Sequence, residues 1–470
     1  MRRGITASLA LWAGLGLAGG RAAVAEGPTY SKDIAPILQK NCQDCHRPGQ
    51  VAPFSLLTYE QARKRGSDLA HETTERRMPP WPASTSYGGP FLDQRVLADA
   101  DIAKIREWAE AGCPEGDPKD APLPREFASD WPLGPPDLIL TMDQPYTLDA
   151  QGSDEFRVFV LGTSLPEDRW IRAVDFKPGN RKVVHHVIAG IDSSGTARKL
   201  DAKDEKPGYE AVGGFGDGVP LRGFLPIWTP GSRARYQPDG SGYLLPKKAD
   251  LLIQMHYHKS GKPETDSTQV GLYLSEKPLK KQVLTGFVFP EITPDQQQTL
   301  VAKFRSQMIS GRRPSLNETF QDILVIEPGE KSYTVKGSTK TGRMMGRPIN
   351  RDILVTSVMP HMHWLGKDFE FWAVLPDEKQ TRVPLIKIDR WDFNWQGTYA
   401  LAEPVHLPKG SYFEMEAHFD NSDANPANPT NPPKKVNWGE ETTNEMCIGI
   451  FEFVFADPAK PASPAATPAS

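Results

Sequence analysis

Three shortages in this sequence exclude common classes of protein. There are only four cysteines among 470 residues, too few for a disulfide scaffold. Neither charge sign dominates, because 55 Lys and Arg stand against 59 Asp and Glu, and the net charge of −4 argues against a nucleic-acid-binding protein. No apolar run reaches the roughly 18 residues that suggest a membrane span, the longest being residues 5–19.

Proline, in contrast, is abundant and limits the fold class. The 44 prolines make up about 9% of the chain, against a usual share of about 5%. Proline ends helices and central strands, so a mostly helical protein is excluded. The 11 Trp, 20 Phe and 12 Tyr are enough to form real cores, which excludes wholesale disorder. At roughly 150 residues per domain, the length predicts about three domains.

The first 25 residues have the features of a secretory signal peptide. Two arginines follow Met1, the apolar run 5–19 comes next, and Ala23-Val24-Ala25 offers a cleavage site before Glu26. A retained membrane anchor is the alternative interpretation. We therefore expect an exported protein, in the periplasm of a bacterium or outside the cell, whose mature chain has no membrane span.

Residues 28–117 have helical periodicity. Ser31 is a candidate cap for a first helix, a second helix is expected near 59–76, and a third begins near Asp99. We predict a small all-α domain here. The Pro- and Asp-rich stretch 118–136 reads as a linker.

The rest of the chain has the pattern of an all-β protein. Short alternating runs separated by turn clusters predict two antiparallel β domains, at 137–290 and 320–456. A polar, partly helical segment, 291–319, connects them. Residues 457–470 are mostly Pro, Ala and Ser and are expected to form a disordered tail.

Cys42-Gln43-Asp44-Cys45-His46 is a C-x-x-C-H motif, the attachment site of a c-type heme. Two thiols one helical turn apart can bond both vinyl groups of one porphyrin, and the adjacent His46 then faces the iron as its proximal ligand. A redox or zinc-binding pair is the alternative, and the exported context weighs against it.

An electron-transferring heme needs a sixth ligand, and we choose Met78. It lies before Pro79-Pro80, which fix the backbone and keep the thioether aimed. The alternatives are that Met78 is an ordinary core residue or that His71 is the ligand. The whole segment, 28–117, resembles a small class I cytochrome c domain.

Six of the ten histidines form three tight groups in the β region: His185 and His186, His256 and His258, His361 and His363. Residues i and i+2 of a strand point to the same side, so each H-x-H pair can chelate a metal. The adjacent pair can serve one metal only at a strand end, a bulge or a distorted turn. One such pair is more often structural, but three in an exported β protein favour metal binding. Imidazoles suit Cu, Zn, Fe and Ni, and an added thioether points to copper.

Four motifs in this order resemble a known family: Val183 to Val187, Leu252 to Tyr257, Met359 to Lys367, and Asn444 to Cys447. They are similar to the copper type II, ascorbate-dependent monooxygenases, which include the peptidylglycine α-hydroxylating enzyme and dopamine β-monooxygenase. The resemblance covers about 155–456. It implies two consecutive antiparallel β-sandwich domains of jelly-roll type, each holding one copper, after the cytochrome c-like domain.

The resemblance also implies how the histidines divide between two copper ions. The first copper, which stores and passes an electron, takes His185, His186 and His256. The second copper, which binds O₂ and hydroxylates, takes His361, His363 and Met446. His258 is either a neighbour of the ligands or structural. His406 and His418 match no ligand motif and are expected to be structural.

The chain departs from the family at its substrate clamp and its cysteines. Members that act on peptides hold a carboxylate with Arg, Asn and Tyr at the positions of Met359, Ile448 and Ile450 here. A peptide ending in glycine is therefore a poor candidate, and a neutral or hydrophobic substrate is favoured. The family's disulfides are missing, and Cys113 and Cys447 are not expected to bond because they lie in different predicted domains.

The leading hypothesis is an exported copper monooxygenase that hydroxylates a small organic substrate with O₂. An ascorbate-like reductant or a redox protein would supply electrons, and the heme in the same chain would be the first group to receive them. The alternatives are a non-catalytic heme and copper electron-transfer or copper-binding protein, and an oxidase that reduces O₂ without an organic substrate. The heme domain could also serve only as a tether or sensor.

The heme hypothesis predicts covalent attachment. Protein matured in an oxidising compartment with heme-attachment machinery should keep its heme through acid–organic extraction. The double variant Cys42→Ala, Cys45→Ala should release it, because both thioether bonds are gone. Loss of heme from the wild type under the same treatment would contradict the assignment of Cys42 and Cys45 as heme-attachment residues.

Overall fold

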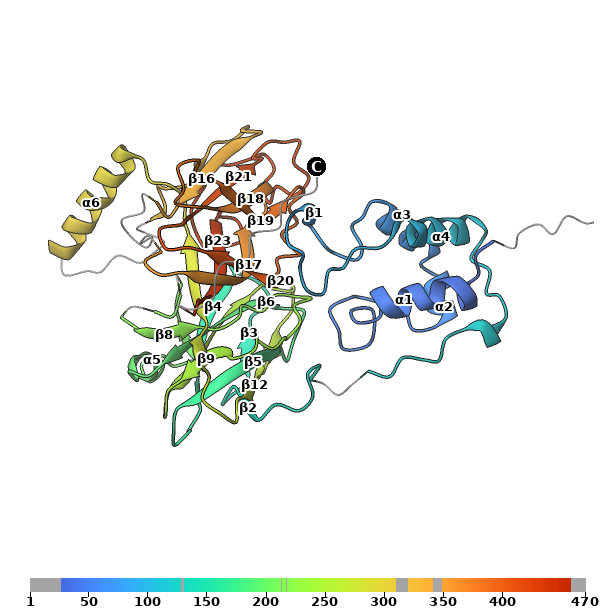
Figure 1. The fold of residues 1–470 in the computed structure, drawn as a ribbon, viewed down its shortest axis with the longest axis horizontal. Helices are drawn as coiled ribbons and strands as arrows, with labels where there is room; N and C mark the ends of the chain where they lie inside the picture. Colours follow the sequence, from blue (N-terminus) through green and yellow to red (C-terminus); the bar gives the residue numbers. More distant parts are fainter. Residues whose placement is uncertain are drawn as a thin grey trace, which may run out of the picture.

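The computed structural model describes residues 27–127, 131–212, 214–216, 218–309, 320–340 and 349–457. The predicted signal peptide and all but the first residue of the predicted tail lie outside these residues. Figure 1 shows a body of β-sheets from which a helical part, drawn in blue, projects to one side. No helix in the described part of the chain is long and apolar enough to cross a membrane.

The helical part has its own small core around Leu38, Ile105 and Trp108. Its elements are η1 (Tyr30–Ile34), α1 (Ala35–Asn41), α2 (Tyr59–Arg63), α3 (Gly66–Thr74) and α4 (Asp99–Glu110). The expected first cap, Ser31, is instead buried inside η1. The expected second helix is two helices, α2 and α3, and α2 begins with a capping box at Thr58.

The prediction that 28–117 is all-α is wrong in one respect. The stretch β1 (Ala83–Gly88) is a strand that pairs antiparallel with β19 (Arg382–Ile388), an edge of the second sandwich. Trp81 and Phe91 flank β1 and pack against the core of that sandwich. Local periodicity cannot reveal such a strand, because its partner lies some 300 residues further along the chain.

The predicted linker, 118–136, follows the helical part. After the short helix η2 (Pro118–Asp120), the carbonyl of Leu123 accepts a hydrogen bond from Gln39, 2.9 Å, and Arg125 donates to the Gln39 carbonyl, 3.0 Å. Arg390 of the second sandwich also donates to the Glu75 carbonyl, 3.2 Å. The helical part is therefore held to the β body by a strand as well as by side chains.

The first sandwich consists of two five-stranded sheets around a core that includes Ile253 and Tyr257. One sheet has the order β7 (Tyr209–Glu210), β4 (Glu155–Gly162), β10 (Asp250–Tyr257), β6 (Val184–Asp192), β8 (Leu221–Phe224). The other has the order β13 (Lys281–Gln282), β9 (Ser241–Leu245), β5 (Arg169–Lys177), β12 (Gln269–Leu274), β2 (Leu138–Thr141). A small pair, β3 (Tyr146–Leu148) with β11 (Glu264–Asp266), and the helix α5 (Thr196–Asp201) complete it.

The second sandwich faces the first and has a core that includes Phe369, Phe371 and Phe419. One sheet has the order β1, β19, β18 (Gly366–Val374), β21 (Tyr412–Phe419), β16 (Tyr333–Ser338). The other has the order β14 (Leu284–Val288), β23 (Cys447–Phe455), β17 (Ile353–Met362), β20 (Tyr399–Leu407). The pair β15 (Val325–Ile326) with β22 (Val436–Asn437) and the helix α6 (Pro294–Ile309) lie beside them.

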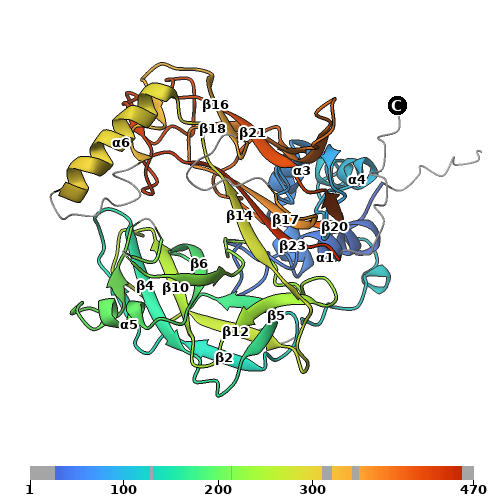
Figure 2. The same ribbon diagram turned by 60° about the vertical axis from the view of Figure 1, so that its left-hand side comes forward.

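Strand β14 places the end of the first sandwich earlier in the chain than predicted. It falls inside 137–290, the range expected for the first sandwich, yet it pairs with β23 of the second, Leu284 opposite Phe453. Figure 2 shows β14 running between the two sandwiches. Its alternation identifies a strand, but nothing in the alternation tells which of two sheets it joins.

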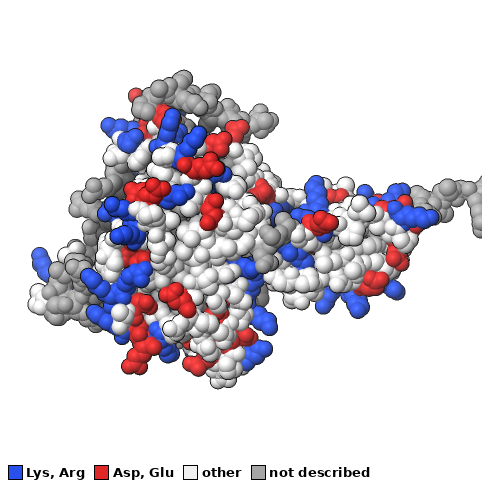
Figure 3. Space-filling model, turned by 90° about the horizontal axis from the view of Figure 1, so that it is seen from below, with Lys and Arg blue, Asp and Glu red and all other residues white. Residues whose placement is uncertain are grey.

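The cysteines and surface charges agree with the composition. All four cysteines are unbonded; Cys113 lies in the helical core and Cys447 in the core of the second sandwich. On the face drawn in Figure 3, Lys and Arg are interspersed with Asp and Glu over both the β body and the helical part.

Candidate metal centres

The adjacent histidines His185 and His186 lie at a bulge between β6 and β10. His186 is opposite His256, but Tyr257 is opposite Val184, so His185 is the extra residue. A bulge turns one side chain out of the normal alternation. This is a distortion of the kind that two neighbouring histidines need in order to serve one metal.

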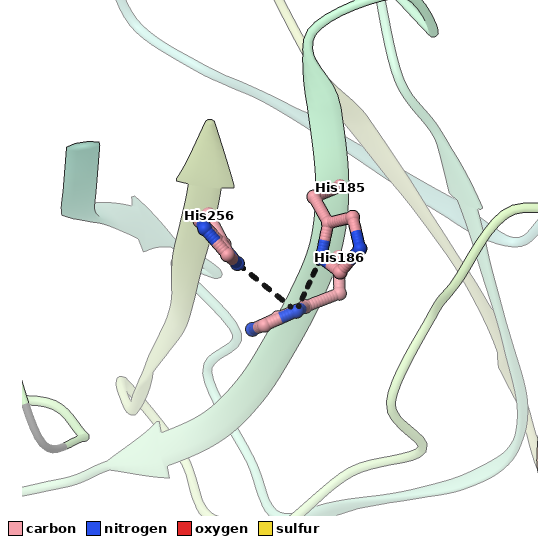
Figure 4. A group of neighbouring side chains, drawn as sticks. All are labelled: His185, His186 and His256. Atoms are coloured by element: carbon pink, nitrogen blue, oxygen red, sulfur yellow. Dashed lines mark hydrogen bonds between the residues drawn. The ribbon is translucent and has the colours of Figure 1, made fainter. Parts of the chain in front are cut away.

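The three imidazoles converge through the same ring atom. The Nδ1 atoms of His185 and His186 are 3.2 Å apart, and those of His256 and His186 are 3.4 Å apart. Figure 4 shows these two contacts as dashed lines that meet at His186. Burial, followed by the charge of the neighbouring His256, lowers the pKa of His185 to about 3 and that of His186 well below its usual value. Neutral imidazoles with lone pairs facing one point are the donor set that a metal ion requires.

Asp154 orients this cluster, although no motif in the sequence points to it. Its buried carboxylate contacts Nε2 of His256 and Nδ1 of His258, each at 2.9 Å. Burial alone would raise the pKa of Asp154, but the hydrogen bonds with the two histidines hold it well below its usual value. Because Nε2 of His256 faces the carboxylate, Nδ1 is left for a metal. The exposed His258 thus supports Asp154 and stays outside the cluster.

His361 and His363 offer the opposite ring atom. Nδ1 of His361 is 2.6 Å from the Gln396 side-chain oxygen, and Nδ1 of His363 is 3.0 Å from the Asn444 carbonyl. Since these oxygens can only accept, each Nδ1 carries the proton and each Nε2 keeps its lone pair. The ring centroids are 5.2 Å apart. This pair is prepared for a metal through Nε2.

Met446 directly precedes β23, and its neighbour Glu445 ties it to the histidines. The fully buried Glu445 carboxylate accepts from the backbone N–H groups of His363, 2.9 Å, Leu365, 2.6 Å, and Met446, 3.2 Å. Burial raises the pKa of Glu445 to about 8. The segments that carry His363 and Met446 are therefore fastened to one side chain, which the sequence analysis did not single out.

Phe393 lies between the two histidine sets. Its ring stacks on His185, with centroids 4.7 Å apart, and meets His363 edge-on at 5.7 Å. The ring belongs to the loop after β19 of the second sandwich, whereas His185 belongs to the first. One aromatic ring thus contacts both candidate metal sites across the junction of the sandwiches.

An apolar cavity of about 540 Å³ opens beside both sets. His186 lines it from one side, and His361, His363 and Met446 line it from the other. Much of its wall is apolar, and it includes Met359, Ile448 and Ile450, the residues at the positions of the family's anion clamp. Further apolar lining residues are Phe224, Phe287 and Phe289. No Lys or Arg is among the described residues that line it.

The C-x-x-C-H motif forms a compact turn directly after α1, and heme attachment there stays a prediction. Cys42 ends α1, and the His46 N–H donates to the Cys42 carbonyl, 2.9 Å, so the motif forms a single turn. Nδ1 of His46 lies 3.2 Å from the Phe54 carbonyl, which leaves Nε2 for an iron. Asp44 forms ion pairs, each 2.7 Å, with Arg125 and with Arg233 of the first sandwich.

The remaining predicted residues lie as follows. Met78 follows α3 and is half-buried, while His71, on α3, is exposed; the choice of sixth ligand stays a prediction. His406 pairs with Asp352 at 3.3 Å and His418 with Asp368 at 2.6 Å, as side chains with structural roles do.

The role of Asp154 gives a prediction. Asp154→Asn removes the charge that orients His256, so the copper affinity of the three-histidine site should fall by about 10–100-fold. Competition with a Cu(I) chelator measures it. Asp368→Asn, which alters the similar contact with His418, is the matched control. Equal affinities in the two variants would contradict the assignment.

Comparison with known proteins gives one informative match. Several solved structures match about two thirds of the chain, but their TM-scores are too low to support an inference about its fold or function. They include the major capsid protein P2 of bacteriophage PM2 (9% identity, 68% of this chain and 97% of that chain, TM-score 0.24) and PNGF-II (8% identity, 68% and 65%, TM-score 0.23). No curated protein matches the chain. Residues 315–457, however, match the family model of the copper type II ascorbate-dependent monooxygenase C-terminal domain, which supports that family and copper-dependent oxygenase chemistry for this protein.

Proposed function

We propose that this protein is an exported copper monooxygenase that hydroxylates a small, uncharged, apolar molecule with O₂. Its electrons enter through a c-type heme attached at Cys42 and Cys45. The observation that carries the proposal is that His361, His363 and Met446 line an apolar cavity next to a second, three-histidine cluster.

The donors at each centre suit copper. Two neutral imidazoles and a thioether form a soft set that favours Cu(I), and three imidazoles suit a one-electron site. Copper, when bound, supplies the O₂ and one-electron chemistry. The protein's part is to aim the donors: Gln396 and the Asn444 carbonyl fix the two rings, and Glu445 holds the Met446 segment against His363.

The cavity defines the class of substrate. Its volume of about 540 Å³ falls within the roughly 300–1,000 Å³ of small-molecule pockets. A carboxylate bound there would find no cationic side chain among the described lining residues and would lie near Glu452, so an anionic substrate is disfavoured. The Thr285 hydroxyl, which is buried without a hydrogen-bond partner, offers one polar contact.

The position of the heme motif supports electron entry at the three-histidine cluster. A small cavity of about 210 Å³ is lined by Val51, which follows the motif, together with His185 and Phe393. The pair Asp44–Arg233 holds the motif against the same sandwich. Because the helical part already contacts both sandwiches, the proposed relay needs no movement of the linker 118–136.

The monooxygenase proposal predicts that Met446 is needed for turnover. Met446→Leu keeps an apolar side chain but removes the thioether, and product formation from an uncharged alkylbenzene should fall at least tenfold. Met415→Leu, in the core of the second sandwich and not among the residues that line the cavity, is the control and should retain turnover. The matching aryl carboxylate should be a poor substrate.

The measurement is O₂ consumption with product analysis on the copper-loaded holoprotein. Equal turnover in the two leucine variants would refute the role of Met446. Consumption of O₂ without any product would favour the oxidase alternative, and no consumption at all would favour the electron carrier.

The relay predicts a kinetic effect of His185. When prereduced protein is mixed with O₂ and substrate in a stopped-flow instrument, His185→Ala should slow reoxidation of the heme at least tenfold and leave its spectrum unchanged. His406→Ala, on the second sandwich, serves as the control. If the heme is oxidised equally fast in both variants, the electrons do not pass through the first copper.

A further inference from the structure

A second cavity, of about 260 Å³, lies where the helical part and both sandwiches meet. All three parts contribute to it: Trp81 and Arg95 precede α4, Arg233 and Arg235 come from the loop before β9, and Tyr399 begins β20. Three guanidinium groups therefore converge at one junction, outside the copper centres.

Several donors at this junction have no partner. Nη1 of Arg95, Nη1 of Arg235 and Nε1 of Trp81 are each buried without a hydrogen bond. A buried donor left unpaired is costly, and a charged one more so. Burial lowers the pKa of both Arg95 and Arg235; the charge of Arg233 adds to this effect on Arg95, whereas on Arg235 the charges of Asp93 and Glu452 oppose it. The unpaired atoms point to a ligand that accepts hydrogen bonds and carries negative charge.

The acidic groups at the junction do not meet this demand. Glu452 is held by Tyr243 and by Ser357, 2.8 Å. Asp93 is exposed at the rim of the cavity. Of the three guanidinium groups, only that of Arg233 has a close ion pair, with Asp44 at 2.7 Å.

The cavity lies next to the heme-attachment motif. Arg233, which lines the cavity, forms an ion pair of 2.7 Å with Asp44, a residue inside the motif. Nε of Arg47, the residue after His46, is also buried without a partner. Unpaired cationic donors therefore surround the place where a heme would be attached.

We propose that this cavity holds the propionate carboxylates of the heme, with Arg95 and Arg235 as their cationic partners and the Trp81 indole as a further donor. The inference rests on the heme part of the proposed function. Guanidinium groups suit carboxylates because they bind them with two parallel hydrogen bonds. The cavity volume of about 260 Å³ lies below the roughly 300 Å³ at which whole-ligand pockets begin, so it fits one edge of a larger group.

The test measures the midpoint potential of the heme in the holoprotein. A cation beside the propionates stabilises the reduced heme, so Arg95→Met and Arg235→Met should each shift the reduction equilibrium toward the oxidised form. A tenfold shift corresponds to about 59 mV for one electron. Arg95→Lys and Arg235→Lys keep the charge and should recover most of the potential. Arg106→Met, on the exposed face of α4, is the control and should leave it unchanged.

A second arm separates the propionates from a free carboxylate. The heme-free double variant Cys42→Ala, Cys45→Ala is titrated with malonate, and so is the holoprotein. Binding to the heme-free protein alone, lost in a further Arg235→Met variant, supports the proposal, because the heme then fills the site. Equal binding to both proteins overturns it in favour of a site for a free carboxylate.

The outcomes also separate this inference from the proposed function. If the heme survives extraction but the potentials of Arg95→Met and Arg235→Met equal that of Arg106→Met, the propionate assignment is overturned and heme attachment stands. If the wild type loses its heme on extraction, the heme part of the proposed function fails, and this inference fails with it.

Discussion

Strand β23 is the element on which the rest of the structure depends. It pairs with β17 and β14 in the second sandwich, while Val454 on the same strand is buried in the core of the first. Glu452 reaches across to Tyr243 of the first sandwich. Because Met446 immediately precedes β23, the packing that joins the sandwiches also sets where the thioether lies relative to His361 and His363.

The sequence predicts those parts of the site that follow from local geometry. His361 lies on β17 and His363 directly follows the end of that strand, with the two ring centroids 5.2 Å apart, and His185 and His186 require the distortion that the bulge provides. Asp154, Phe393 and Gln396 escape sequence analysis for a common reason. Each acts on a histidine 30 to more than 200 residues away, and no spacing records such a contact.

The fold shows the same division between local and distant information. Alternation predicts the two β regions, and α4 begins where the sequence places it, at Asp99. The sequence predicts a helical domain around β1, because the partner of this strand, β19, follows in another domain. The sheet membership of β14 also depends on a distant partner. Both differences concern edges of sheets, where pairing is decided by the whole fold.

The crossing of β14 has a consequence for how the two halves move. This strand follows directly after β13 of the first sandwich and is hydrogen-bonded along its length to β23 of the second. Three contacts cross the junction of the sandwiches: Tyr243 donates to Glu452 of β23, Val454 of β23 is buried in the first core, and Phe393 stacks on His185, so moving the halves apart would break all three. The spacing of the two histidine sets is therefore set by the packing of this junction. Under the proposed function, an electron that passes between them would cross packed protein and would not wait for an encounter in solvent.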